Sequence, residues 1–214
     1  MGGFPCQSFS IAGKRLGFED TRGTLFFEIA RVLKAKQPRL FLLENVKGLL
    51  SHDNGQTFRT IIATLDELGY DLQWQVLNSK NHGVPQNRER VFIIGHIRGT
   101  SRPEVFPFSV DTGEVAQTVR RAKIKSSARG FGSSGSYVDK NDIVPTLTQS
   151  MGTGGNNVPM TTSEMKIRRL TPTECERLQG FPDGWTIGSD TQRYKQCGNA
   201  VTVNVIKDIM LKLL

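Results

Sequence analysis

The sequence predicts an α/β fold in which buried strands alternate with amphipathic helices over residues 24–97. Two apolar runs carry this prediction, because 39–46 (RLFLLENV) and 90–96 (RVFIIGH) are typical of strands buried on both faces. Residues 72–77 alternate between apolar and polar side chains, which predicts a further strand. We expect 39–46 to be a parallel strand of an open sheet.

Two helices are predicted between these strands. Apolar side chains recur at helical spacing in 24–36 and in 58–68. Pro38 follows the first helix and Gly69 the second, and both residue types end helices. Ligands of open α/β sheets bind at the carboxyl ends of the strands, and Glu44-Asn45 stands at such an end.

Residues 166–214 predict two more helices. The first begins at Thr171, where Pro172 suits the first helical position and Glu174 completes a capping box. It is expected to stop at Gly180. Apolar residues at helical spacing predict the second helix over 199–214.

Residues 99–163 differ in composition from the rest of the chain. They are rich in Gly, Ser, Thr, Asn and Pro and hold few long apolar runs. A segment of this kind predicts a second small lobe or a long irregular insertion. It contains a basic cluster, made up of Arg120, Arg121, Lys123, Lys125 and Arg129.

Composition restricts the class of protein. The 214 residues are 37% hydrophobic, which suits one domain or one domain with a small lobe. The net charge of +8 favours a polyanionic partner, although a merely basic surface explains it equally well. No apolar run is long enough to cross a membrane, so a cytoplasmic protein is expected.

The cysteines and histidines predict neither a disulfide framework nor a metal site. Three cysteines, at 6, 175 and 197, form no C-x-x-C pair, and their number is odd. His52, His82 and His96 share no metal-ligand spacing and are expected to be structural. Trp74 and Trp185 are expected in the core.

Four short blocks carry the chemistry of this sequence. They are Pro5-Cys6-Gln7, Glu44-Asn45-Val46, Gln86–Arg90 (QNRER) and Gly198-Asn199-Ala200-Val201. The first block alone is a weak signal, because a small buried cysteine beside a turn gives the same tripeptide. The order and the spacing of all four blocks are highly specific.

In this order the blocks resemble the DNA cytosine-C5 methyltransferase family. A fifth block of that family, Arg-x-Leu-Thr-x-x-Glu, is matched within 168–185 (RRLTPTECERLQGFPDGW). The likeness covers nearly the whole chain apart from the variable region, where Thr146-Leu147 is a candidate for the family's Thr-Leu pair. The tRNA-modifying branch carries a Cys-Phe-Thr tripeptide that is absent here.

The resemblance implies an incomplete Rossmann-like methyltransferase sheet with a small irregular target-recognition lobe. It implies a catalytic part over 1–98, a target-recognition region over 99–165 and a return to the methyltransferase domain over 166–214. The implied context is a bacterial or phage restriction-modification enzyme that acts on the nucleoid.

The implied reaction explains the residue types. A thiolate that adds to carbon 6 of cytosine makes carbon 5 nucleophilic enough to take a methyl group, and Cys6 is the expected nucleophile. Arg88 and Arg90 are the expected cationic neighbours that favour the thiolate. Glu44 is expected to hydrogen-bond the ring nitrogen and amine of the target base.

The methyl donor implied by the resemblance is S-adenosylmethionine. Pro5, Asn199 and Val201 are the donor contacts that it implies in this sequence.

The implied substrate is double-stranded DNA, whose target base must be flipped out of the helix. The Gly-rich loop 8–23 is a candidate lid over that base, although a solvated turn has the same composition. The residues expected to contact DNA are Gln7, Ser10, Lys14, Arg15, Arg22, Arg120, Arg121, Lys123 and Lys125.

The family also carries, ahead of its Pro-Cys-Gln block, a Phe-x-Gly-x-Gly turn that holds most of the donor. The sequence shows no such turn, so the chain is expected to lack three strands and the strand that leads into the nucleophile. The strand 39–46 would then be an open edge, and a complementary N-terminal polypeptide or self-association would cover it. The alternative is an inactive remnant that binds DNA or a partner subunit.

Overall fold

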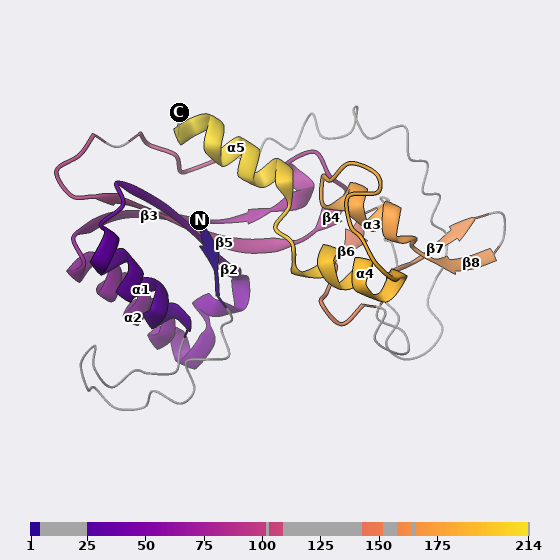
Figure 1. The fold of residues 1–214 in the computed structure, drawn as a ribbon, viewed down its shortest axis with the longest axis horizontal. Coiled ribbons are helices and arrows are strands. Elements are labelled where there is room, and N and C mark those ends of the chain that lie inside the picture. The colour runs from indigo at the N-terminus through magenta and orange to yellow at the C-terminus, as the bar shows by residue number, and fades with distance from the viewer. Residues whose placement is uncertain (5–24, 102, 109–142, 152–157, 164–165, 214) are drawn as a thin grey trace. The chain divides into compact units, whose positions relative to one another are not determined.

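The computed structural model describes residues 1–4, 25–101, 103–108, 143–151, 158–163 and 166–213. The chain divides into two compact units, and each is described by itself. Unit 1 comprises Met1–Leu77 and Glu89–Phe108, and unit 2 comprises Asn78–Arg88 and Ser109–Leu214 (Figure 1). This division follows packing, and the three functional regions expected from the sequence stay a prediction.

Unit 1 is built on a four-stranded sheet in the order β1-β2-β5-β3. The strands are β1 (Gly2–Gly3), β2 (Leu40–Val46), β3 (Tyr70–Asn78) and β5 (Glu89–Ile97). β2 runs parallel to β1 and antiparallel to β5. The sheet is therefore mixed, with a parallel pairing on the β1 side of β2 and an antiparallel pairing on the β5 side.

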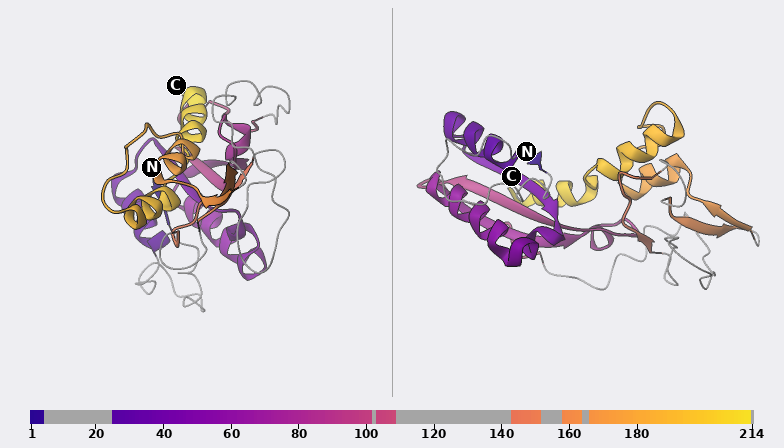
Figure 2. Two further views of the ribbon diagram at one scale, coloured as in Figure 1. Left: turned by 90° about the vertical axis from the view of Figure 1, so that its right-hand side faces the viewer. Right: turned by 90° about the horizontal axis from the view of Figure 1, so that it is seen from below.

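The helices α1 (Leu25–Lys36) and α2 (Gln56–Glu67) lie on one face of this sheet (Figure 1, Figure 2). Their apolar side chains share one core with alternate residues of the two central strands. The fully buried members include Phe26, Ile61, Leu65, Tyr70 and Val91. Both helices were predicted from their spacing, and Gly69, with φ +89°, follows α2 as expected.

The 3-10 helices η2 (Lys47–Leu50) and η3 (His52–Gly55) join β2 to α2.

Gly95 lies within β5 opposite Phe41, and a Cβ at Gly95 would come within 2.2 Å of the Phe41 ring. The aromatic ring therefore covers the glycine across the two strands, which explains how a glycine is tolerated inside a buried strand.

The expected open edge at residues 39–46 is wrong at Leu43 and Glu44, where β2 has a neighbouring strand. β1 pairs with β2, Gly2 opposite Leu43 and Gly3 opposite Glu44, and β5 pairs with β2 on the other side. Two residues of the strand that leads into the Pro-Cys-Gln block are therefore present, and they shield the end of β2 where Glu44 lies.

The segment 103–108 packs on β3 of unit 1 through glutamine side chains. Gln73 accepts a hydrogen bond from the backbone N–H of Val105 (2.9 Å) and donates one to the carbonyl of Pro103 (2.9 Å). Gln75 accepts one from the N–H of Phe108 (2.7 Å). The first part of the irregular region thus has a fixed path beside a strand.

The described part of unit 2 combines two small β-ladders with three α-helices. β4 (Gln86–Asn87) pairs in parallel with β6 (Val144–Pro145), and β7 (Met160–Ser163) pairs antiparallel with β8 (Lys166–Arg169). The core contains Val144, Leu147, Met151, Val158, Leu170, Cys175, Leu178 and Cys197. The 3-10 helix η4 (Ser79–Asn81) precedes β4.

The α-helices in the described part of unit 2 are α3 (Pro172–Leu178), α4 (Asp190–Asn199) and α5 (Val203–Leu213). The predicted capping box of α3 is confirmed, with Thr171 and Glu174 bonded reciprocally. The predicted helix over 199–214 is wrong at its start. Asn199 is the last residue of α4, Ala200 is extended at φ −70° and ψ 154°, and α5 begins only at Val203.

Both tryptophans are exposed, which corrects the prediction that they belong to the core. Trp74 is 46% exposed and meets Phe58 edge-on at 4.9 Å between ring centroids. Trp185 is 63% exposed and stacks on Phe181 at 6.0 Å. No helix in the described part of the chain is long and apolar enough to cross a membrane.

Candidate active site

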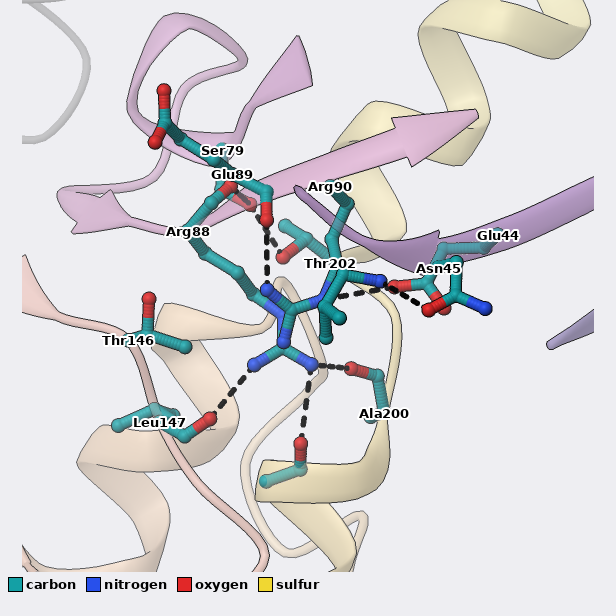
Figure 3. Close-up of polar contacts among 12 residues, drawn as sticks. Glu44, Asn45, Ser79, Arg88, Glu89, Arg90, Thr146, Leu147, Ala200 and Thr202 are labelled. Atoms are coloured by element: carbon teal, nitrogen blue, oxygen red, sulfur yellow. Dashed lines mark hydrogen bonds and ion pairs between the residues drawn. The ribbon is translucent and has the colours of Figure 1, made fainter. Parts of the chain in front are cut away.

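The carboxyl end of β2 holds an ion pair in unit 1. Arg90 Nε lies 3.0 Å from Glu44 Oε1, and the two side chains are only 15% and 14% exposed. The register places Val46 opposite Arg90 and Glu44 opposite Phe92, so the pair spans the two strands diagonally. Figure 3 shows the two side chains pointing toward one another.

Burial lowers the pKa of Arg90, while the charge and the hydrogen bond of Glu44 act in the opposite direction. An arginine stays protonated despite such a shift, so the guanidinium of Arg90 is the cation beside the carboxyl group of Glu44. A pair with this little exposure is poorly screened by solvent, and the guanidinium therefore fixes the orientation of the carboxylate.

Glu44 also lies beside Gly3 of β1. A Cβ on Gly3 would stand 3.3 Å from Glu44 Oε2. The small size of Gly3 therefore makes room for the carboxylate next to β1. Gly3, which precedes the first block in the chain, therefore lies next to Glu44 of the second block.

Asn45 ties β2 to the residue just before Pro5. Its Nδ2 donates a hydrogen bond to the carbonyl of Phe4 (2.7 Å), and its Oδ1 accepts one from the N–H of Val46 (2.8 Å). The side chain is buried. A buried amide with both ends bonded has one orientation, so Asn45 fixes the backbone from which Cys6 follows.

Eleven of the predicted catalytic, donor-binding and DNA-binding residues lie outside the described residues: Pro5, Cys6, Gln7, Ser10, Lys14, Arg15, Arg22, Arg120, Arg121, Lys123 and Lys125. Their roles stay predictions. Among the described residues, no group of three or more His, Cys, Asp or Glu side chains is placed to hold a metal ion.

Arg88 is 3% exposed and belongs to unit 2. Its Nη1 donates to the carbonyl of Leu147 (2.7 Å), and its Nη2 donates to the carbonyls of Gly198 (3.1 Å) and Ala200 (2.8 Å) (Figure 3). Hydrogen bonds to three backbone carbonyls favour a positioning role for Arg88 over the expected contact with the thiolate.

Gln86 lies two residues before Arg88 and completes the hold on Leu147. Its Oε1 accepts the N–H of Leu147 (3.1 Å), and its Nε2 donates to the carbonyl of Leu178 (2.9 Å). Gln86 and Arg88 thus bond both backbone groups of one residue.

The last turn of α4 packs directly on backbone. A Cβ at Gly198 would come within 2.2 Å of the carbonyl oxygen of Thr148. Only a glycine allows this approach, because backbone atoms cannot move aside as a flexible side chain does. The Gly of the Gly-Asn-Ala-Val block is therefore explained by packing.

Gln179 and Thr202 hold the residues on either side of that turn. Gln179 Nε2 donates to the carbonyl of Cys197 (2.6 Å), and the carbonyl of Gln179 accepts the N–H of Val203 (2.9 Å). Thr202 Oγ1 lies 2.9 Å from Gln179 Oε1 and 2.8 Å from Ser79 Oγ. All these side chains are buried, so the turn has little freedom.

The two predicted donor contacts that the structure describes lie within this held turn. Asn199 is exposed and Val201 is half-buried, while Gly198 and Thr202 are buried. The backbone is thus fixed from one side, and Asn199, Ala200 and Val201 keep part of their surface accessible.

Sequence reasoning missed four residues that organise these sites: Asn45, Gln86, Gln179 and Thr202. Asn45 and Gln86 stand inside blocks that were singled out, so the blocks themselves were the available signal. Gln179 and Thr202 are joined by tertiary contacts across 23 positions, which no local pattern encodes.

Comparison with known proteins places the chain in a family. The profile of the C-5 cytosine-specific DNA methylases matches residues 1–122 and 108–214. The chain is 40% identical to the type II methyltransferase M1.ScrFI of Lactococcus lactis subsp. cremoris over all of this chain and 61% of that enzyme. It is 39% identical to M.HpaII of Haemophilus parainfluenzae over 99% of this chain and 70% of that enzyme.

A solved structure agrees at the level of the fold. The S. pombe Dnmt2 methyltransferase superposes with a TM-score of 0.68 at 20% identity, over 99% of this chain and 76% of that one. The chain spans about three fifths to three quarters of the length of these relatives. On the profile match and these identities, the chain belongs to the C-5 cytosine-specific DNA methylase family.

Proposed function

We propose that this chain carries the nucleophile and the cytosine-binding carboxylate of an S-adenosylmethionine-dependent DNA (cytosine-5-)-methyltransferase. The observation that carries the proposal is the pair of Glu44 and Arg90 beside Gly3, where the backbone leads into Pro5-Cys6. A carboxyl group held by a cation, together with the cysteine that follows Gly3 by three positions in the chain, provides the two groups that addition to cytosine needs.

The first step is addition of the Cys6 thiolate to carbon 6 of a flipped cytosine. A sulfur–carbon bond forms, and the electron pair of the C5–C6 double bond moves so that carbon 5 becomes nucleophilic. The carboxyl of Glu44, protonated before this step, gives its proton to the ring nitrogen as negative charge develops there, accepts a hydrogen bond from the exocyclic amine, and takes the proton back when the adduct breaks down. Arg90 keeps the carboxylate of Glu44 in place during this step.

S-adenosylmethionine, when bound, supplies an electrophilic methyl group that carbon 5 accepts. A base then removes the proton from carbon 5, the electron pair restores the C5–C6 double bond, and the bond to Cys6 breaks. Cysteine suits both the first and the last step of this reaction, because its thiolate is a strong nucleophile and a good leaving group.

Asn199 and Val201 fit a part of the donor site. An exposed amide next to a half-buried apolar side chain can bond a polar group and cover an apolar one, and their backbone is held rigidly. Pro5 joins this set in the proposal.

DNA is the proposed substrate. Gln7, Ser10, Lys14, Arg15 and Arg22 are proposed to surround the flipped base. The basic residues Arg120, Arg121, Lys123 and Lys125 are proposed to contact phosphates or guanine edges in the target-recognition region.

A complementary polypeptide or a second copy of the chain is a further proposal. β1 has two residues and stands at one end of the strand order in the described sheet. A strand from another chain that pairs with β1 would extend the sheet. Sedimentation of the chain with and without the N-terminal part of a relative tests this proposal, and a lone monomer in both samples counts against it.

Methyl transfer from labelled S-adenosylmethionine to unmethylated DNA tests the activity directly. The chain is assayed alone and together with the N-terminal part of a relative. We expect transfer that is lost in Cys6→Ala and kept in Cys175→Ala, which removes a buried thiol from the core of unit 2. Transfer that survives in Cys6→Ala would overturn the assignment of the nucleophile.

A further inference from the structure

We propose that Arg88 is a positioning residue that fixes the donor-binding turn Gly198–Val201 against Leu147, which lies within the variable region. The inference rests on the proposed function, since it takes Asn199 and Val201 as donor contacts. It assigns Arg88 to backbone carbonyls, not to the reacting base, and four observations within unit 2 carry it.

The first observation is the way α4 ends. The last carbonyls of a helix have no partner within it, and many helices solve this with a left-handed glycine that turns the chain back. Here Ala200 is extended instead, at φ −70° and ψ 154°. The carbonyls of Gly198 and Ala200 accept hydrogen bonds from Arg88 Nη2, and a cation at this end also suits the helix dipole.

The second observation is that the same guanidinium reaches another segment. Arg88 Nη1 bonds the carbonyl of Leu147, and Gln86 bonds the N–H of that residue. The parallel pairing of β4 with β6 brings the two segments into this register, with Asn87 opposite Pro145. Thr146 adds a hydrogen bond to the carbonyl of Asn87 (2.7 Å).

The third observation is the close approach of Gly198 to Thr148, where a Cβ would lie 2.2 Å from a carbonyl oxygen. Two backbones in direct contact have no side chains to interlock them. The guanidinium of Arg88 donates hydrogen bonds to carbonyls of both segments and so joins them. Arg88 is buried, which strengthens these charge-assisted hydrogen bonds.

The fourth observation is what the turn leaves accessible. Arg88 holds the carbonyls at 198 and 200, and Thr202 is held by Gln179 and Ser79. The exposed Asn199 and half-buried Val201 alternate with these held positions. Displacement of the turn would therefore move both proposed donor contacts together.

Arginine is required for this task, because its planar fork presents several N–H groups in fixed directions. Lysine keeps the charge but offers a single ammonium group, which cannot reach carbonyls on both segments with the same geometry. Arg88→Lys therefore separates positioning from charge. Arg59→Lys is the matched control, because Arg59 is exposed on α2 of unit 1.

The test combines amide hydrogen exchange with donor binding, measured on the full chain. In Arg88→Lys we expect faster exchange in two separate segments, 146–149 and 197–203, and a Kd for labelled S-adenosylmethionine raised roughly tenfold or more, the size of one charge-assisted hydrogen bond. In Arg88→Ala, free guanidinium at non-denaturing concentration is expected to restore part of the protection in both segments. Arg59→Lys is expected to match the wild type.

Several outcomes overturn the inference. Faster exchange confined to 86–90, or spread over the whole of unit 2, would show that Arg88 does not link the two segments. Loosened segments with an unchanged donor Kd would show that the turn does not hold the donor. If the wild-type chain binds no donor, the donor assignment of the proposed function fails, and hydrogen exchange alone still decides whether Arg88 orders the turn.

Discussion

Gly198 lies so close to Thr148 that a side-chain carbon on the glycine would stand 2.2 Å from the carbonyl oxygen of the threonine. The contact joins the end of α4 to the segment after β6, and it explains why a glycine precedes Asn199. Gly198→Ala must push two backbones apart, and overpacking of this kind destabilises a fold by about 1–3 kcal/mol.

We therefore expect Gly198→Ala to lower the melting temperature and to weaken donor binding. Gly48→Ala is the control, because a Cβ there would meet no atom within 4 Å. Thermal denaturation and donor binding of both variants check the prediction. Equal behaviour of the two variants would show that the close contact does not constrain the turn.

Glu44→Gln is expected to lower the rate of methyl transfer by about 10²-fold or more, the usual range for a group that assists a reacting proton or charge. The substitution keeps the size of the side chain but removes the charge that pairs with Arg90. Glu89→Gln is the matched control, because Glu89 pairs with Lys47 at an exposed site. Single-turnover rates at saturating DNA check the prediction, and equal losses in both variants would contradict it.

Asn45→Asp removes a donor while keeping the shape of the side chain. The carbonyl of Phe4 then faces a carboxylate oxygen and loses its hydrogen bond, while the N–H of Val46 keeps an acceptor. We expect a fall of at least roughly tenfold in the chemical step, since a buried unpaired carbonyl costs about 1–3 kcal/mol. Donor binding should not change.

Asn54→Asp is the control for this substitution, because Asn54 is exposed in η3. If Asn45→Asp weakens donor binding by as large a factor as it slows the chemical step, Asn45 does not act on the nucleophile segment alone, and the prediction is contradicted.

Glu176 is expected to make the stability of unit 2 depend on pH. Burial alone would raise the pKa of its carboxyl, but hydrogen bonds from Thr186, Arg193 and the N–H of Gly184 outweigh it and lower the pKa to about 2, from a usual value of 4.5. Because the folded-state pKa is depressed, the stabilisation is fully present above about pH 4.5 and is lost as the pH falls toward about 2.

We expect Glu176→Gln to lower the free energy of unfolding at neutral pH by about 2 kcal/mol and to flatten its decline across this acidic window. Glu67→Gln, at an exposed position of α2, is the control. Denaturation followed by the fluorescence of Trp185, in a Trp74→Phe background, reports on unit 2. If the free energy of unfolding of Glu176→Gln falls with acid as steeply as that of the wild type, the prediction is contradicted.

Elements with a clear local signal were predictable from the sequence. The apolar period of α1 and α2 and the capping residues of α3 each specify an element without distant contacts. α4 was missed because its sequence DTQRYKQCGN has no apolar stripe, although Ser189 and Gln192 form a capping box that was a usable signal. The pairing of β2 with β1 depends on two glycines, which carry no strand pattern.

The candidate site was predictable in its residues and only partly in their roles. Glu44 and Arg90 were both singled out, and the structure pairs them. Arg88 was placed beside the thiolate because charge was its only visible property in the sequence. Its bonds to Leu147, Gly198 and Ala200 join residues separated by 59 to 112 positions, so local reasoning could not reach them.

The central claim is that Cys6 adds to carbon 6 of cytosine, and loss of label from carbon 5 tests it without the methyl donor. Addition makes carbon 5 nucleophilic, so it takes a proton from water, and reversal releases either hydrogen. We predict that the chain releases tritium to water from DNA labelled at carbon 5 of cytosine, that Cys6→Ala abolishes the release, and that Cys175→Ala retains it. No release by the wild-type chain, or equal release by Cys6→Ala, would contradict the claim.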